Sequence, residues 1–323
     1  MDYSSDFKAY PLLMEPVLKD YIWGGNRLSE VFGKKSDLEK VAESWEVSTQ
    51  NGNQSRIANG EYEGMPLDEY IALNREKILG KNCAQMTEFP VLIKLIDAKD
   101  NLSVQVHPND EYVENGQSGK TEMWYVVDAE PDASIILGFS REITKDEFIR
   151  RIKNNTLLEV LNKIPVKKGD VFYVKAGTLH AIGKGILIAE IQQNSDITYR
   201  VFDYGRTDKN GNPRELHIND ALEVTKRTPP EDDYKSLNLT CGDGETLLVK
   251  NRYFCVYKCV DTKTINVTDE SFCVLLFIDG DGELLYEGKQ LKVRRGDSVF
   301  IPAGFGKINL EGNFTALKTT IEN

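Results

Sequence analysis

The sequence predicts a mainly β fold of barrel or sandwich type with a few added helices, and two observations support this prediction. Short runs of β-branched and aromatic residues, typical of strands, are separated by turns rich in Gly, Asp and Asn. The clearest predicted strands cover residues 91–96, 123–127, 171–174 and 273–278. A faint internal repeat indicates that the chain contains two such β units.

The repeat consists of residues 169–180 and 296–307, which align with both of their glycine anchors in register. It predicts two domains, residues 1–235 and 236–323, connected by the segment 228–243, which is rich in proline and acidic residues. His180 of the first copy corresponds to Lys307 of the second, and a protonated ammonium group cannot bind a metal. We therefore expect the second domain to lack metal ligands.

Helices are expected to be a minority of the fold. Pro66 favours the start of a helix that should stop near Gly80. Thr144 and Glu147 form a capping-box pattern ahead of an amphipathic run, which we expect to remain helical to about Asn162.

The composition predicts a globular protein with a substantial core, because 40% of its 323 residues are hydrophobic and 28% are charged. No apolar run approaches the ~20 residues needed to cross a bilayer, and the start of the chain lacks an export signal. We therefore expect a cytoplasmic protein that does not contact membranes. The formal net charge of −11, without a stripe of basic residues, argues against nucleic-acid binding.

The five cysteines predict free thiols. Their number is odd and they contain no Cys-x-x-Cys pair, so a disulfide framework is disfavoured. Their spacing also disfavours a structural zinc site, although four of them lie in the C-terminal part of the chain.

Residues 102–108 and two later positions predict a metal site. Side chains alternate along a strand, so Ser103, Gln105 and His107 should project to one face while the apolar residues between them pack on the other. Glu122 and His180 come from separate segments of strand-and-turn character, as a site in the mouth of a barrel requires. Two neutral imidazoles combined with oxygen ligands suit zinc or a similar divalent ion.

These motifs also resemble those of a known family. Residues 169–180 resemble the second motif of cupins, and residues 105–108 with 120–122 resemble the first motif of type I mannose-6-phosphate isomerases in their shorter bacterial form. Further matches to that family lie at residues 21–25, 43–46 and 190–200. One departure is Lys175, where cupins usually have proline, and it affects a strand end and not a ligand.

The resemblance implies two cupin-type β-barrels, each a double-stranded β-helix or jelly roll, and one zinc ion per chain. The implied zinc ligands are Gln105, His107, Glu122 and His180. It further implies the reversible conversion of mannose 6-phosphate to fructose 6-phosphate through a cis-enediol, with the metal polarising the oxygens on C1 and C2. The implied partner is a small sugar phosphate, and the chain would act as a monomer or a homodimer.

Glu190 and Arg200 are the candidate catalytic residues. Glu190 follows the apolar run 186–189, where burial would raise the pKa of a carboxyl group towards a useful range for proton transfer. Alternatively, it orients a ligand or pairs with Arg200. The Arg200 guanidinium could bind phosphate or stabilise enediolate charge. Arg206 could bind phosphate or pair with local aspartates, and His217 is expected to be structural.

Four further residues are expected to contact the substrate. Lys94 interrupts an apolar strand and so requires a functional reason, and Lys120 would add positive charge. Ser103 shares the inward face of its strand with the predicted ligands. Trp23 precedes two glycines that could place its indole at the wall of the pocket, whereas the alternative for Trp23 and Trp45 is a role in core packing.

Three classes of function remain possible on this evidence. The first is a metal-dependent aldose–ketose isomerase, acting on mannose 6-phosphate or on another sugar phosphate. The second is a metal-dependent cupin oxygenase, which is weakened because glutamine occupies one ligand position. The third is a noncatalytic sugar-binding cupin, which would not need the ligand set, Glu190 and Arg200 together. The isomerase is therefore the favoured prediction.

Overall fold

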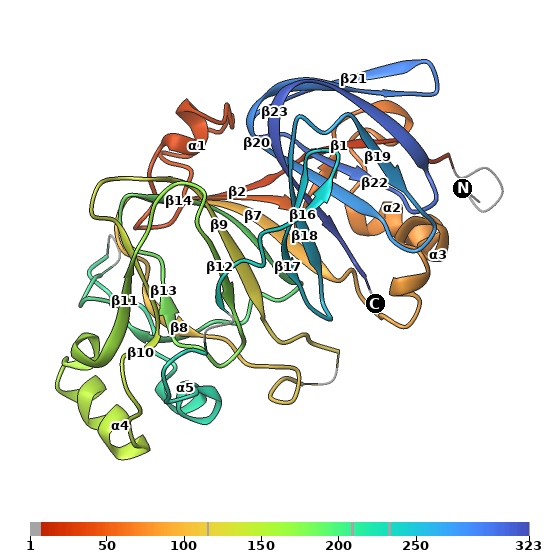
Figure 1. The fold of residues 1–323 in the computed structure, drawn as a ribbon. Coiled ribbons are helices and arrows are strands. Elements are labelled where there is room, and N and C mark those ends of the chain that lie inside the picture. The colour runs from red at the N-terminus through yellow and green to blue at the C-terminus, as the bar shows by residue number, and fades with distance from the viewer. Residues whose placement is uncertain (1–7, 115, 208–209, 232–233, 323) are drawn as a thin grey trace.

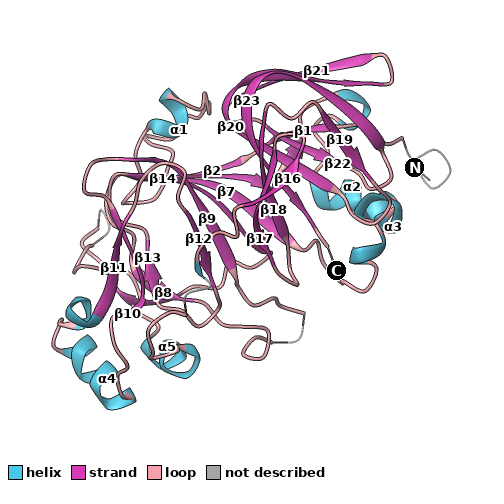
Figure 2. Cartoon of the chain, in the orientation of Figure 1, coloured by secondary structure: helices cyan, strands magenta, loops and turns pink. Residues whose placement is uncertain are grey.

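Strands dominate the chain and form two β-sheet assemblies that lie next to each other (Figure 1). The structure is a computed structural model that describes residues 8–114, 116–207, 210–231 and 234–322. Helices occupy the periphery of both assemblies (Figure 2). All four strands predicted from the sequence are present, which confirms the mainly β fold class.

The first assembly consists of two sheets. The six-stranded sheet has the order β12 (Val171–Val174), β9 (Glu122–Ala129), β14 (Ile186–Gln193), β7 (Val91–Ala98), β3 (Glu43–Val47) and β2 (Val17–Lys19). The five-stranded sheet has the order β11 (Leu161–Pro165), β10 (Ser134–Phe139), β13 (His180–Ala181), β8 (Val104–Val106) and β15 (Tyr199–Phe202). Apolar residues of both sheets, among them Trp124, Ile188 and Ile135, share one buried cluster. This packing closes the two sheets into the first barrel.

The second assembly is a ten-stranded sheet. Its order is β16 (Leu239–Gly242), β17 (Glu245–Lys250), β18 (Cys255–Val260), β23 (Gly306–Thr320), β20 (Cys273–Tyr286), β22 (Ser298–Ile301), β1 (Leu12–Glu15) and β6 (Arg56–Ile57), with β19 (Thr264–Val267) on β23 and β21 (Lys289–Arg294) on β20. A separate two-stranded ribbon joins β4 (Thr49–Gln50) and β5 (Asn53–Gln54). The N-terminal strand β1 thus completes the C-terminal sheet, with Leu12 opposite Phe300.

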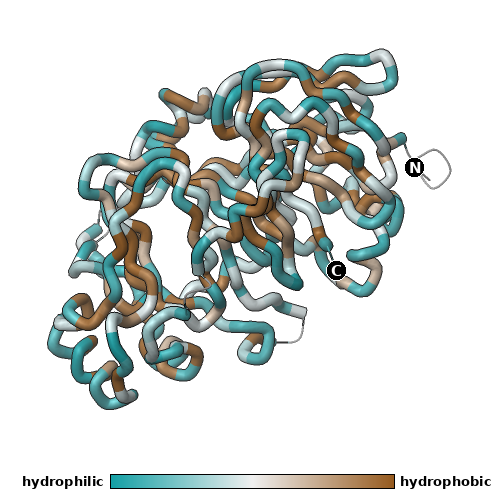
Figure 3. The backbone as a smooth tube through the Cα atoms, in the orientation of Figure 1, coloured by the Kyte–Doolittle hydropathy of each residue, from teal (hydrophilic) through white to brown (hydrophobic). Residues whose placement is uncertain are grey.

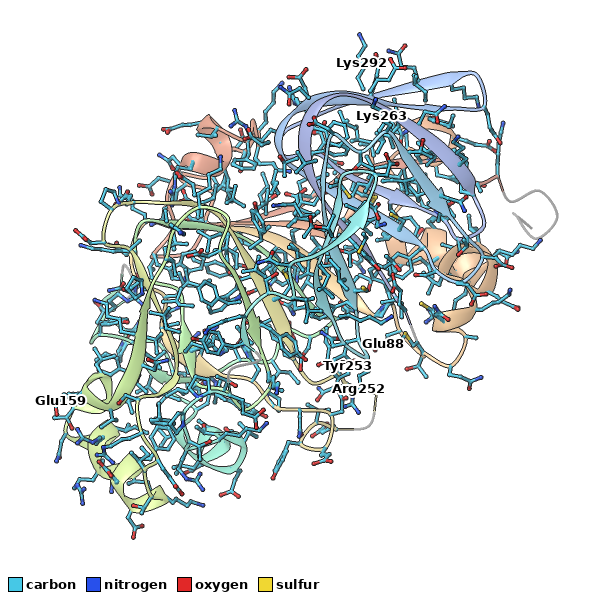
Figure 4. All side chains as sticks on the ribbon, viewed as in Figure 1. Glu88, Glu159, Arg252, Tyr253, Lys263 and Lys292 are labelled. Carbon is cyan, nitrogen blue, oxygen red and sulfur yellow. The ribbon has the colours of Figure 1, made fainter. Side chains whose placement is uncertain are left out.

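The expected boundary at residues 235 and 236 is therefore crossed by strand pairing, and it remains a prediction. The connecting segment also differs from an open linker, because its last residues form β16 and Lys235 makes a bridge to Phe172. Its acidic residues Asp232 and Asp233 lie outside the described residues. The N-terminal and C-terminal parts of the chain meet again at Asp110, which accepts hydrogen bonds from Arg252 Nη2 (2.8 Å) and Tyr253 Oη (2.6 Å), both labelled in Figure 4.

The helices of the described residues are short. They are α1 (Arg27–Glu30), α2 (Leu67–Leu73), α3 (Arg75–Leu79), α4 (Lys145–Lys153) and α5 (Ile218–Val224), with 3-10 turns η1 (Gly60–Tyr62), η2 (Lys81–Cys83) and η3 (Leu157–Val160). The helix predicted between Pro66 and Gly80 is divided at Asn74, whose extended backbone (φ −160°) interrupts α2 and whose side chain caps α3. Among the described helices, none is long and apolar enough to span a membrane.

The helix predicted from Thr144 begins as expected but ends too early. The Thr144 hydroxyl accepts a hydrogen bond from the Glu147 amide (3.1 Å), which confirms the N-cap. The helix stops at Lys153, not near Asn162, because Asn155 adopts a left-handed conformation (φ 54°). The apolar residues beyond it belong to η3 and β11. The spacing of the buried residues in these two elements resembles that of a continued amphipathic helix.

The two copies of the repeat have the same backbone structure. Gly169 and Gly296 open the turns with φ values of 91° and 94°, and β12 and β22 each begin two residues later. The following aspartates accept equivalent amide hydrogen bonds of 2.9 Å, at Asp170 from Lys167 and at Asp297 from Arg294. In both halves the apolar segments follow the strands and the polar segments follow the loops (Figure 3).

Candidate metal centre and active-site cleft

The predicted ligands come from three strands that meet at one end of the first barrel. Gln105 lies in β8, His107 directly follows that strand, His180 begins β13 and Glu122 begins β9. Gln105 and His180 are direct partners in the antiparallel pairing of β8 with β13, so their side chains lie on the same face. The fold therefore brings together residues that are up to 75 positions apart in the sequence.

His107, Glu122 and His180 form a buried cluster whose potential ligand atoms all lie within 4.8 Å of one another. Nε2 of His107 is 3.6 Å from one Glu122 carboxylate oxygen, and Nε2 of His180 is 3.4 Å from the other. These four atoms have no hydrogen-bond partner among the described residues. Buried polar atoms without partners are costly, so the cluster has the character of a ligand set.

The other ring nitrogens fix the imidazole tautomers. Nδ1 of His107 lies 2.8 Å from the Ile197 carbonyl oxygen, and Nδ1 of His180 lies 2.8 Å from the Thr178 carbonyl oxygen. A neutral imidazole that donates from Nδ1 presents the lone pair of Nε2 to the cluster, which is the arrangement usual for metal-binding histidines.

The electrostatics of the cluster also favour a cation. Burial lowers the pKa of His180 to about 4 and that of His107 well below its usual value, so both rings are neutral near pH 7. Burial and the nearby Glu190 raise the pKa of Glu122 to about 8, and the ammonium groups of Lys120 and Lys94 offset only part of this effect. A bound divalent cation would add positive charge, and the three residues fit one.

A cleft of about 400 Å³ opens beside this cluster. Its wall contains Trp23, Ser103, Gln105 and Glu190, together with residues from β2, β3, β7, β15 and the adjoining loops. Five cationic side chains line it: Lys19, Lys94, Lys120, Arg200 and Arg214. Three carboxylates, those of Glu43, Glu190 and Asp196, also line it, so the cleft has a small excess of positive charge in a chain whose formal net charge is −11.

The contacts of Lys94 explain why a lysine occupies this position in an apolar strand. Its ammonium group lies 3.8 Å from a Glu43 carboxylate oxygen and 3.4 Å from one of Glu190, and 4.8 Å from the centre of the Trp45 ring. Burial by itself would lower the pKa of Lys94, but the two carboxylates outweigh this effect and raise it. Lys94 is therefore a buried cation at the floor of the cleft.

Glu190 differs from its prediction in two respects. It pairs with Lys94 and accepts a hydrogen bond of 2.9 Å from Trp124 Nε1. Its charge partner is therefore Lys94 and not Arg200, the partner considered as an alternative. Burial alone would raise the pKa of Glu190, but the ammonium groups of Lys94 and Lys120 lower it below its usual value. The prediction of a raised pKa was wrong, since the charge partners from other strands were not visible in the sequence.

Arg200 and Ser103 are connected across the cleft wall. Arg200 Nε donates to Ser103 Oγ (3.3 Å), which in turn donates to the amide oxygen of Gln105 (3.3 Å). Arg200 Nη1 is held by the Glu215 carbonyl oxygen at 2.9 Å. Lys120 reaches the cluster, with its ammonium group 3.5 Å from a Glu122 oxygen.

Of the remaining predicted residues, Trp23 lies in the cleft, whereas Arg206 and His217 lie outside it. Trp23 is 4% exposed, lines the cleft and stacks on Tyr21 at 5.4 Å. Gly24 is required there by close packing and not by flexibility, because a Cβ would lie 2.3 Å from that of Ala42. Arg206 forms an ion pair with Asp203, and His217 lies outside the cleft at the start of α5.

Sequence reasoning missed several residues of the cleft, among them Lys19, Tyr21, Glu43 and Arg214. Arg214 is held by Asp203 through hydrogen bonds of 2.8 and 2.5 Å, and its place in the cleft depends on a long loop that carries no local signal. Tyr21 and Glu43 lie within segments that resemble the isomerase family, and this was the only signal available for them.

Comparisons with known proteins agree with this geometry. A model of the phosphomannose isomerase type I catalytic domain matches residues 12–144, and one of the mannose-6-phosphate isomerase cupin domain matches residues 244–321. Mannose-6-phosphate isomerase ManA of Bacillus subtilis is 39% identical over 313 residues, which cover 94% of this chain and 96% of the relative. The mannose-6-phosphate isomerase of Streptococcus mutans is 39% identical over 297 residues, covering 91% and 93%.

Solved structures give the same result. A crystal structure of the mannose 6-phosphate isomerase from Bacillus subtilis matches with a TM-score of 0.87 and 36% identity, covering 97% of this chain and 99% of that chain. A zinc-bound structure of mannose 6-phosphate isomerase shares the fold, with a TM-score of 0.79 at 17% identity over 97% of this chain and 100% of that one. The chain therefore belongs to the type I mannose-6-phosphate isomerase family.

Proposed function

We propose that this protein interconverts mannose 6-phosphate and fructose 6-phosphate. The observation that supports this most directly is the juxtaposition of a buried His–Glu–His cluster with a cleft lined by five cationic side chains. A phosphorylated sugar satisfies both, because its phosphate complements the cations and its hydroxyl and carbonyl oxygens are suitable neighbours for a metal. The relatives that cover almost the whole chain carry the name of this activity.

We propose that His107, Glu122 and His180, with Gln105 beside them, hold one zinc ion. Two neutral imidazoles and a carboxylate suit zinc, and a zinc-bound protein shares the fold. When bound, such an ion polarises sugar oxygens and stabilises negative charge that develops on them. The second ring nitrogens, anchored to backbone carbonyls, keep both imidazoles oriented towards that position.

The reaction moves one proton from C2 to C1 of the opened sugar. A base removes the C2 proton, the C1 carbonyl oxygen becomes a hydroxyl and a cis-enediol results. Return of a proton to C1 and loss of the proton on the C2 hydroxyl give the ketose. We propose Glu190 as the base, because it lines the cleft and is ionised near pH 7, as a group that accepts a proton must be.

The cationic residues would bind and orient the substrate. Lys120 lies 3.5 Å from a Glu122 oxygen of the cluster and Arg200 lines the same cleft, where both can stabilise enediolate charge or hold phosphate. Lys94 holds Glu190 in place through their 3.4 Å ion pair and also lines the cleft. Ser103 fixes the Arg200 side chain, and Trp23 supplies an apolar wall.

We further propose that residues 1–235 carry out the reaction and that residues 236–323 support them. The enzyme would act in the cytoplasm as a monomer or homodimer. Its five cysteines are free thiols, four of them buried, as expected in a reducing compartment.

The test follows the reaction directly. Purified protein is incubated with mannose 6-phosphate in deuterated water, and fructose 6-phosphate is followed by NMR before chelation, after chelation and after zinc is restored. We expect deuterium at C1 of part of the product, loss of turnover on chelation and recovery with zinc. Full turnover after complete metal removal would refute the metal role, and no turnover by the zinc-loaded protein would refute the activity.

A further inference from the structure

Strand β3 contains an extra residue next to the cleft. Trp45 is paired with Lys94 of β7, but the next regular pair joins Val47 to Ile93, so Glu46 has no partner of its own in β7. This is a β-bulge, which bends a strand and changes the direction of neighbouring side chains. On the cleft side of the bulge, Trp45 and Glu43 surround the ammonium group of Lys94.

The Glu46 side chain points to the opposite side and is completely buried. One carboxylate oxygen accepts hydrogen bonds from Ser44 Oγ (2.6 Å) and lies 2.7 Å from Lys34 Nζ. The other accepts a hydrogen bond of 2.8 Å from Ser298 Oγ. A buried carboxylate is tolerated only where such partners are present, so this network compensates for the burial of the Glu46 carboxylate in the bulge.

Two of these contacts depend on the C-terminal copy of the repeat. Ser298 begins β22, and the Gly296 carbonyl oxygen accepts a hydrogen bond of 2.5 Å from Lys34 Nζ. The second copy of the repeat, in which Lys307 occupies the position of His180, thus retains the turn and the strand. Both contact the network on the side of β3 that faces away from the cleft. The C-terminal domain contacts the strand whose other face forms the cleft.

We propose that Glu46 is a positioning residue, through which β22 of the C-terminal domain fixes the bulge of β3 and hence the places of Trp45 and Lys94 in the cleft. This inference rests on the proposed function for its catalytic consequence, but not for its structural one. It gives the C-terminal domain a defined role: it sets the geometry of the substrate side of the site without supplying a group that touches substrate.

The test removes the Ser298 hydroxyl by mutation and monitors the environment of the Trp45 side chain by fluorine NMR. The chain has three tryptophans, so protein labelled with 5-fluorotryptophan gives three fluorine resonances, and Trp45→Phe identifies one of them. Ser298→Ala should move that resonance and lower kcat/KM about tenfold, with the metal content unchanged. Ser298→Thr, which keeps the hydroxyl, should restore most of both.

The matched control is Ser271→Ala. Ser271 is another buried serine of the C-terminal domain, with hydrogen bonds of 2.8 Å to the Phe272 carbonyl oxygen and 2.9 Å from the Ile321 amide, and it is not part of the cleft. Its loss should reduce stability without moving the Trp45 resonance or changing kcat/KM.

The outcomes separate the inference from the proposed function. An unmoved Trp45 resonance in Ser298→Ala, or an equal movement in Ser271→Ala, would overturn the inference whether or not the protein is an isomerase. If Ser298→Ala does not fold, Lys34→Met is compared with Lys318→Met, which breaks the partly buried Lys318–Glu245 pair (2.6 Å) elsewhere in the C-terminal sheet. Movement confined to Lys34→Met supports the inference, and movement in both or neither refutes it.

Discussion

Replacing His180 with asparagine should change how the stability of the metal-free protein depends on pH. His180 is buried and neutral, and burial lowers its pKa from 6.5 to about 4. Below pH 6.5 the unfolded chain gains a proton at this residue while the folded chain does not. In the wild-type protein, His180 should therefore lower the free energy of unfolding as the pH falls from about 6.5 to about 4. This contribution should be absent from His180→Asn.

The size of this effect follows from the two pKa values. At about 1.4 kcal/mol per pKa unit, the difference between 6.5 and about 4 amounts to about 3 kcal/mol below pH 4. Between pH 7 and pH 5 the same relation gives about 2 kcal/mol. Glu122 acts in the opposite direction, because its raised pKa of about 8 adds stability at low pH that is lost as the pH rises. Both proteins contain Glu122, so its titration contributes to both curves.

The assay is urea unfolding of the chelated proteins at pH 7 and pH 5. Wild type should lose about 2 kcal/mol more than His180→Asn over this interval. His217→Asn serves as the control, since this histidine lies outside the cleft with 29% of its side chain exposed, and it should behave as wild type does. Equal pH dependence in wild type and His180→Asn would refute the description of His180 as a buried neutral ring.

Three further predictions concern the site, a helix cap and the core. Glu190→Gln should lower kcat at least about a hundredfold while the metal content stays unchanged, and Glu159→Gln, at an exposed carboxylate that does not line the cleft, should have no effect. Thr144→Ala should reduce the free energy of unfolding by about 1 kcal/mol through loss of the α4 cap, with turnover retained. Phe277→Ala, at a fully buried ring of the C-terminal core, should cost about 3–5 kcal/mol in urea unfolding.

The strands and the shared face of Ser103 and Gln105 could be predicted because both depend on short-range pattern. Alternation along residues 102–108 places Ser103 and Gln105 on one face whatever the partner strands are, and the structure has both at the cleft. The turns at Gly169 and Gly296 could be predicted for the same reason, since a positive φ favours glycine locally. The end of α4 could not, because the buried apolar residues of η3 and β11 continue the helical spacing by coincidence.

The partners of the charged side chains were the main feature that could not be predicted from the sequence. The pKa of Glu190 is lowered because Lys94 lies beside it in β7, and Arg214 enters the cleft because Asp203 holds it there. Each pair joins residues whose separation in the chain says nothing about their distance in space. Coulombic interactions fall off with that distance, so their sign and size depend on the assembled fold.

The sequence by itself therefore determined the fold class, the resemblance to an isomerase family and the chemical types of the candidate metal ligands, since all three are properties of local pattern and residue identity. Only the tertiary structure decided that β1 belongs to the C-terminal sheet, that Glu190 pairs with Lys94 and that Glu46 forms a bulge held by Ser298. The physical reason is that strand pairing and buried charge pairs join distant residues, and their energies exist only once those residues are in contact.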